Sequence, residues 1–195
     1  MRLNKLAIVI VCCSFALGTY AQNSEGYEGK YRPFSIYAGA GPSLFINNLV
    51  ISKDDVKPFK YAISARFMWE PKNSFVSLGI ESGYYKLYTV SSSSPKAEVS
   101  NSAIPILFVV SMKFGKGFYG DFCMGQSVTK SKVTNTDSSY NFNSSTWSFS
   151  DFSVALGYRF VQKQRISYAV ELKGFYSSGY ENATIALLFI VGFKL

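Results

Sequence analysis

Residues 184–195 read Thr184-Ile185-Ala186-Leu187-Leu188-Phe189-Ile190-Val191-Gly192-Phe193-Lys194-Leu195. Every second residue from Ile185 to Leu195 is apolar, whereas the alternate residues include Thr184, Gly192 and Lys194. Because successive side chains of a β-strand point to opposite faces, this pattern predicts a strand with one fully apolar face. A strand of this kind is typical of a barrel whose outer surface contacts lipid.

Earlier segments show related alternation and predict seven further strands, at residues 34–46, 59–70, 75–90, 103–114, 118–133, 148–161 and 166–176. The segments between them are polar and alternate in length, which predicts long loops at 47–58, 91–102 and 134–147, short turns at 71–74, 115–117 and 162–165, and a modest loop at 177–181. Short turns at one end and long loops at the other are the pattern of outer-membrane barrels. The sequence therefore predicts an all-β fold, an eight-stranded antiparallel up-and-down transmembrane β-barrel. The even strand count predicts that both termini are periplasmic.

The first residues have the layout of a cleavable signal peptide. A short basic region is followed by an apolar run at 6–18 and then by Thr19-Tyr20-Ala21, which predicts cleavage after Ala21. The apolar run is shorter than the roughly 20 residues that span a bilayer. We therefore predict a signal peptide at 1–21, a periplasmic lead-in at 22–33 and an outer-membrane barrel domain at 34–195.

A lipoprotein signal is the alternative, since Cys12 and Cys13 lie in the apolar run. The bulky residues Ile10 and Val11 precede them, which argues against that kind of site. After cleavage only Cys123 remains, so the mature domain would contain no internal disulfide.

Aromatic residues, 17% of the chain, gather at two depths. One group lies near the predicted short turns: Trp69, Phe75, Phe114, Phe118, Phe160, Tyr168 and Phe193. The other lies near the predicted long loops: Tyr61, Tyr84, Tyr85, Tyr88, Trp147, Phe149, Tyr176 and Tyr180. Two such belts are typical of aromatic anchoring at the two membrane interfaces.

These features together resemble the small outer-membrane β-barrel family of Gram-negative bacteria. The resemblance covers 34–195 and rests on pattern rather than on a catalytic motif. Members commonly end in an aromatic residue that the insertion machinery reads, whereas here Phe193 is followed by Lys194 and Leu195. The resemblance implies a monomeric, porin-like protein of the cell envelope in contact with outer-membrane lipid and lipopolysaccharide. It also implies that barrel-insertion machinery and periplasmic chaperones are partners during assembly.

The predicted inward face carries charges of both signs. An eight-stranded barrel has an interior just wide enough to be filled by side chains, so charges there must be paired. We predict an interior ion-pair network, in which Glu81, Asp121 and Glu171 are partners of arginine or lysine, and at most a narrow pore. Its predicted members are Arg66, Glu81, Lys113, Asp121, Asp151, Arg159, Glu171 and Lys173.

Catalytic functions are disfavoured because the sequence contains no histidine. This excludes Ser-His-Asp catalysis and histidine-based metal sites. A carboxylate pair, Glu81 and Glu171, would be a candidate for acid–base chemistry only in principle. We predict no catalytic, cofactor-binding or metal-binding residue and no cofactor.

Lysines cluster towards the predicted long loops. The net charge is +8, but no Lys/Arg cluster or motif indicates a nucleic-acid partner. Contact with lipid phosphates of the outer leaflet and ordinary solvation explain these lysines equally well. The residues concerned are Lys53, Lys57, Lys86, Lys96, Lys130 and Lys132.

The sequence thus predicts a non-enzymatic integral outer-membrane barrel with a role in envelope structure or surface interaction. An accessory factor for secretion or envelope assembly is an alternative, which copurification of envelope machinery would distinguish. A soluble, secreted, lipocalin-like carrier of a lipophilic ligand is an alternative of another class, with its apolar faces turned inward. The low charged fraction, 16% of the chain, argues against a freely soluble surface.

Overall fold

The computed structural model describes residues 32–46, 56–57, 59–93, 96–135, 141–162, 165–180 and 182–195. The predicted signal peptide and nearly all of the predicted lead-in lie outside the described residues, as does most of the predicted loop at 47–58. Within the described part, no helix is long and apolar enough to cross a membrane.

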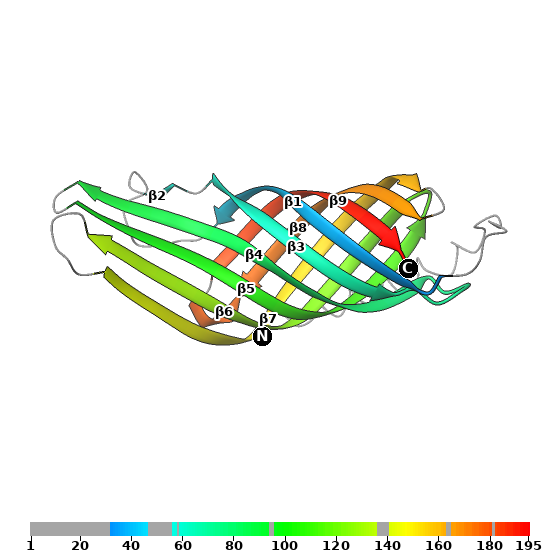
Figure 1. The fold of residues 1–195 in the computed structure, drawn as a ribbon, viewed down its shortest axis with the longest axis horizontal. Coiled ribbons are helices and arrows are strands. Elements are labelled where there is room, and N and C mark those ends of the chain that lie inside the picture. The colour runs from blue at the N-terminus through cyan, green and yellow to red at the C-terminus, as the bar shows by residue number, and fades with distance from the viewer. Residues whose placement is uncertain are drawn as a thin grey trace, which may run out of the picture.

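Eight long antiparallel strands form a closed barrel (Figure 1). They are β1 (Phe34–Ile46), β3 (Phe59–Trp69), β4 (Val76–Ser93), β5 (Lys96–Gly115), β6 (Phe118–Asn135), β7 (Asn141–Gln162), β8 (Ile166–Ser177) and β9 (Asn182–Lys194). Each long strand pairs with its neighbours along the chain, and β1 pairs with β9 to close the ring. A short strand, β2 (Val56–Lys57), pairs with β4, and a single 3-10 turn, η3 (Ser178–Tyr180), precedes β9. The predicted eight-stranded antiparallel barrel is confirmed.

The two faces of the strands have opposite character. In β9 the odd-numbered residues from Ile185 to Phe193 are exposed on the outside, and the even-numbered residues from Asn182 to Gly192 are buried inside. The other strands repeat this alternation, so an apolar band surrounds the barrel. This is the arrangement that a lipid environment requires of a barrel.

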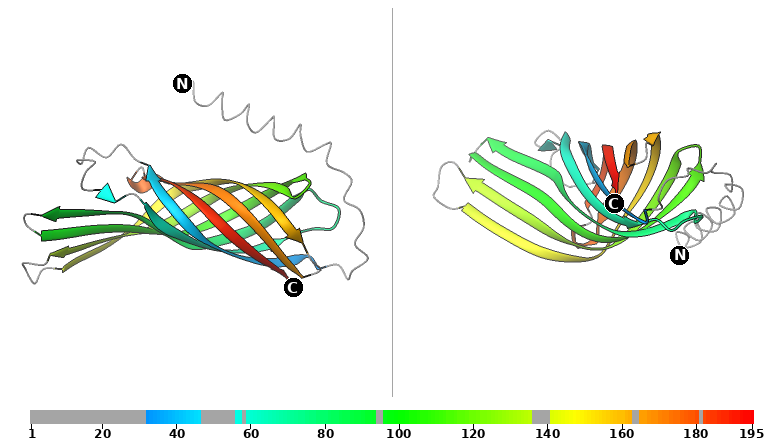
Figure 2. Two further views of the ribbon diagram at one scale, coloured as in Figure 1. Left: turned by 90° about the horizontal axis from the view of Figure 1, so that it is seen from above. Right: turned by 45° about the vertical axis from the view of Figure 1, so that its right-hand side comes forward.

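Two strands, β5 and β7, are much longer than the sequence predicted, and β4 and β6 each end a few residues later than predicted. Figures 1 and 2 show β4, β5, β6 and β7 reaching together beyond the other strands at the long-loop end. The loop predictions at 91–102 and 134–147 were therefore wrong, since β4 continues to Ser93, β5 begins at Lys96 and β7 begins at Asn141. We call this four-stranded part the strand extension; it consists of residues 86–93, 96–102, 130–135 and 141–147.

The half of the interior nearer the long-loop end contains a cluster of apolar side chains. Phe45, Tyr85, Leu87 and Phe175 are buried there, and the rings of Tyr85 and Phe175 stack with their centroids 4.7 Å apart. The placement of Tyr85 in an outer aromatic belt was wrong, because consecutive strand residues face opposite sides and the outward position is taken by Tyr84. Charged side chains are concentrated in the other half of the interior.

Candidate functional site

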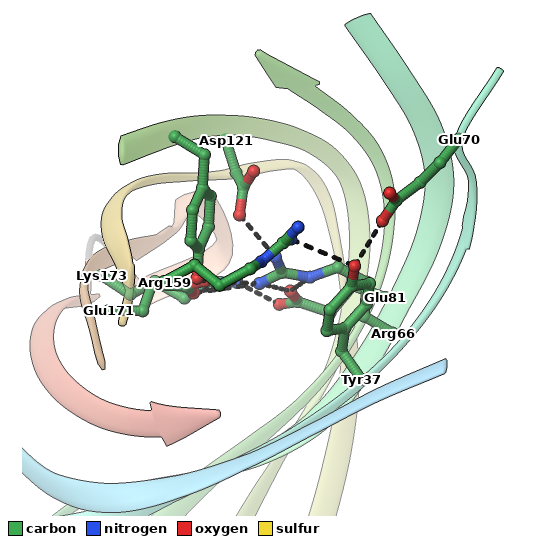
Figure 3. Close-up of polar contacts among 9 residues, drawn as sticks. Tyr37, Arg66, Glu70, Glu81, Asp121, Arg159, Glu171 and Lys173 are labelled. Carbon is green, nitrogen blue, oxygen red and sulfur yellow. Dashed lines mark hydrogen bonds and ion pairs between the residues drawn. The ribbon is translucent and has the colours of Figure 1, made fainter. Parts of the chain in front are cut away.

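Arg66, on β3, holds three carboxylates from three other strands (Figure 3). Its Nε donates to Oε2 of Glu81 at 2.8 Å, its Nη1 to Oδ2 of Asp121 at 2.5 Å, and its Nη2 to Oε1 of Glu171 at 2.9 Å. The Arg66 side chain is 6% exposed and the three carboxylates are fully buried. One guanidinium therefore connects β3 to β4, β6 and β8 across the barrel.

Lys173 completes this cluster from β8. Its ammonium donates to Glu81 and lies 3.9 Å from Oε1 of Glu171, and the hydroxyl of Tyr119 donates to Oε2 of Glu171 at 3.0 Å. Two cations and three carboxylates thus lie together with almost no exposure. Such a cluster is tolerated in a protein interior only when each charge has close, hydrogen-bonded partners.

The sheet register explains why these side chains meet. Arg66 is directly opposite Glu81 in the β3–β4 pair, and directly opposite residues have Cβ atoms within about 5.5 Å of each other. Glu171 and Lys173 are two apart on β8, so both point into the barrel. We call the five residues Arg66, Glu81, Asp121, Glu171 and Lys173 the central network.

Two other predicted residues, Lys113 and Arg159, belong to a second group nearer the short turns. Lys113 Nζ lies 3.2 Å from Oε2 of Glu70, and the hydroxyl of Tyr37 donates to Oε1 of the same carboxylate. Arg159 Nη2 donates to the hydroxyl of Tyr37 at 3.1 Å. The structure therefore separates Lys113 and Arg159 from the central network.

The structure does not bring Asp151 to the central network. Its carboxylate instead accepts hydrogen bonds from the hydroxyls of Ser127 and Ser148 and, at 2.8 Å, from the backbone N–H of Ser178. Ser150, with φ of 67°, forms an irregularity next to it in β7. The role visible for Asp151 is thus to join β6, β7 and the turn η3.

Sequence reasoning missed two tyrosines, Tyr37 of the second group and Tyr119, which contacts the central network. Tyr37 lies directly opposite Gly192, and Tyr119 lies directly opposite Gly157. In both pairs the ring covers the glycine, because a Cβ placed on either glycine would lie within 2.5 Å of the tyrosine ring. A glycine opposite a tyrosine on an inward face is the signal that would have found them, since aromatic rings commonly cover such glycines.

Three of the predicted lipid-contacting lysines can be placed, and all are on the outer face of the strand extension. Lys86 is half-buried and donates to the hydroxyl of Ser100, while Lys130 and Lys132 are exposed. The register aligns Lys86 and Lys130 on either side of Ser102. Lys53 and the side chains of Lys57 and Lys96 lie outside the described residues. We call Lys86, Lys130 and Lys132 the lysine cluster.

A closed ring of eight antiparallel strands with an apolar outer face is the architecture of small outer-membrane proteins. Solved structures of such proteins are similar to this chain in fold. The attachment invasion locus protein Ail of Yersinia pestis is 11% identical, with a TM-score of 0.53 over 85% of this chain and 100% of that protein. Neisserial surface protein A (NspA) is 11% identical, with a TM-score of 0.53 over 84% and 97%. The outer-membrane protein OprG from Pseudomonas aeruginosa is 8% identical, with a TM-score of 0.50 over 85% and 98%. This chain therefore has the fold of the small outer-membrane β-barrels.

Sequence comparisons add nothing to this result, since no protein-family model and no curated protein matches the chain.

Proposed function

We propose that this protein is a non-enzymatic integral outer-membrane barrel whose strand extension faces outward and binds phosphate groups of outer-leaflet lipid. In this arrangement the short turns and both termini are periplasmic. The role is one in envelope structure and surface interaction. The observation that carries the proposal is the position of the lysine cluster.

The lysine cluster lies one step beyond the aromatic belt of the long-loop end. Val128 is paired with the exposed Trp147, and Lys130 is the next outward residue along β6. Two strand residues advance about 7 Å along the strand, so Lys130 lies on the headgroup side of the aromatic belt. Lysine side chains near such a surface contribute about 1 kcal/mol each to contact with anionic lipid.

The interior supports a structural role over a catalytic one. Glu81 and Glu171, the carboxylates that would be candidates for acid–base chemistry, are both held by Arg66 and Lys173. A general base must be free to take a proton from a substrate, whereas these carboxylates form buried ion pairs with Arg66 and Lys173. The apolar cluster around Tyr85 and Phe175 fills the barrel between the central network and the strand extension.

We expect the protein to be found in the outer-membrane fraction and to be heat-modifiable. Because a closed barrel has no unpaired edge strand along its membrane-spanning part, it should stay folded in cold detergent and migrate differently after boiling. The measurement is a denaturing gel of fractionated membranes, run unboiled and boiled. A soluble product with no mobility shift would contradict the membrane assignment and favour a soluble carrier.

Charge reversal of the lysine cluster tests the proposed lipid contact. We expect Lys86→Glu/Lys130→Glu/Lys132→Glu to lower copurifying lipopolysaccharide about tenfold and to make cells more sensitive to detergent, because three attractive contacts become repulsive. The matched control is Lys72→Glu/Lys116→Glu/Arg165→Glu, which reverses three exposed positive charges at the short-turn end.

Equal lipopolysaccharide association in the two variants would refute the lipid contact. If the tagged protein then copurified with envelope proteins, the accessory role in secretion or envelope assembly would be the better account. Both variants keep the mobility shift on boiling if they are folded, so loss of association can be separated from loss of the barrel.

A further inference from the structure

The barrel contains a cavity of about 520 Å³ at its short-turn end. Its walls include the turns at 71–75 and 115–118, and Arg66 of the central network lies at its inner limit. Its volume falls in the range of small-molecule sites, about 300–1,000 Å³. The second group described above, with Tyr37, Glu70 and Arg159, lines this cavity. Figure 3 shows these three side chains beside the central network.

Arg159 differs from the other arginine and the two lysines that pair inside the barrel. Arg66, Lys113 and Lys173 each have a carboxylate within 4.0 Å. Within the described residues, no carboxylate lies at that distance from Arg159. Its guanidinium therefore lines the cavity without direct contact to a described carboxylate, and it reaches the nearest one, Glu70, only through the hydroxyl of Tyr37.

Two tyrosine rings hold this guanidinium in place. Its central carbon lies 5.5 Å from the ring centroid of Tyr37 and 5.6 Å from that of Tyr119. Rings at these distances stabilise a cation but leave its N–H groups to be satisfied by other partners. Because each ring is seated on a glycine of the neighbouring strand, the orientation of the guanidinium is fixed by the fold.

Two buried polar atoms of cavity-lining residues are available to bind a ligand. In the described part of the chain, Arg159 Nε is buried and has no hydrogen-bond partner, and neither has the hydroxyl of Ser77, a cavity-lining residue that is only 2% exposed. Buried polar atoms are normally paired, so each such atom needs an explanation. An oxygen-rich anion would accept hydrogen bonds from both kinds of donor.

We propose that this cavity binds a small solute through an oxyanion, a carboxylate or phosphate group, with Arg159 as its main partner. A planar guanidinium offers parallel N–H bonds that match both kinds of oxyanion. Lys113 and Lys116 line the same cavity and add positive potential along the approach. The solute enters from the short-turn end, because the central network and the apolar cluster fill the barrel beyond it. This proposal depends on the barrel but not on the lysine cluster.

The test is an NMR titration of the full barrel in detergent micelles, with ¹⁵N-labelled arginine and ¹³C-labelled tyrosine rings. Inorganic phosphate and succinate are the two probes, added at constant ionic strength with chloride as balance. We expect the Nε–H signal of Arg159, assigned by its loss in Arg159→Gln, to shift saturably with at least one probe. The probe that saturates identifies the oxyanion as phosphate or carboxylate. The signal of Arg165, an exposed arginine at the same end, should not shift.

Variants separate this site from general attraction to a basic protein. We expect Arg159→Gln to weaken binding at least tenfold, read from the tyrosine signals, and Lys113→Gln to weaken it severalfold. The matched control is Arg165→Gln, which removes an equal charge outside the cavity and should bind as the parent does. Arg159→Lys, which keeps the charge, serves if Arg159→Gln fails to show a mobility shift on boiling. Shifts that do not saturate, or equal affinities in the Arg159 and Arg165 variants, would overturn the proposal.

Discussion

Arg66→Ala is expected to lower the free energy of unfolding by about 3–5 kcal/mol, because it leaves buried carboxylates without their principal cation. Glu81, Asp121 and Glu171 would then share a fully buried site with Lys173 alone. The measurement is urea unfolding in detergent micelles, followed by the fraction that keeps the mobility of the unboiled form.

The matched control is Arg165→Ala, because Arg165 is exposed and its loss should change stability by less than about 0.5 kcal/mol. Adding Asp121→Asn/Glu171→Gln to Arg66→Ala should recover part of the lost stability, since the two unpaired carboxylates are removed while Glu81 stays as the partner of Lys173. If Arg66→Ala were as stable as the parent, the central network would not be a stabilising feature of the interior.

Gly157→Val is expected to cost about 3 kcal/mol and to remove the oxyanion site at the same time. A Cβ at this position would lie 2.1 Å from the ring of Tyr119, so the ring has to move. That movement combines overpacking with loss of the hydrogen bond from Tyr119 to the buried Glu171. It also removes one of the two rings that hold Arg159. The same urea titration measures the stability, and the arginine NMR spectrum reports the position of Arg159.

Gly174→Val is the control for this prediction. A Cβ on Gly174 meets only the carbonyl oxygen of Val154, at 3.9 Å, which is an ordinary contact. The same substitution should therefore be tolerated there. Equal costs at the two positions would mean that the packing of Tyr119 on Gly157 is not what the first substitution disturbs.

The membrane-spanning part of the fold could be predicted because lipid and a filled interior impose opposite demands on successive residues. Thus β9 and β3 begin and end within a few residues of the predicted strands. The strand extension could not be predicted in this way, because both of its faces are polar enough to meet water. In β7 the irregularity at Ser150 also changes which residues face outward, with Trp147 and Phe149 before it and Phe152 after it. The alternation of outward and inward residues in the barrel part of β7 therefore does not continue past Ser150 into the strand extension.

The sequence allowed the charged residues of the interior to be predicted, but not the uncharged residues that contact them. Arg66 and its three carboxylates all lie at inward positions of predicted strands, and their charge alone requires that they find one another. The serine partners of Asp151 were not predictable, because serine occurs at many inward positions of this chain and nothing in the sequence singles these out. The rings of Tyr37 and Tyr119 required knowledge of which glycine each faces across the sheet.

The pairing of β1 with β9 has a consequence for how the protein folds. Ser35 is paired with Lys194, so the ring closes through a contact between the two most distant strands of the chain. Contacts of such long sequence separation carry a large loop-closure entropy and slow the folding reaction. Arg66 collects its carboxylates from β4, β6 and β8, so the central network is complete only when the sheet has curled upon itself. We therefore expect these charges to stay hydrated until the ring closes, and to lose their water late in folding.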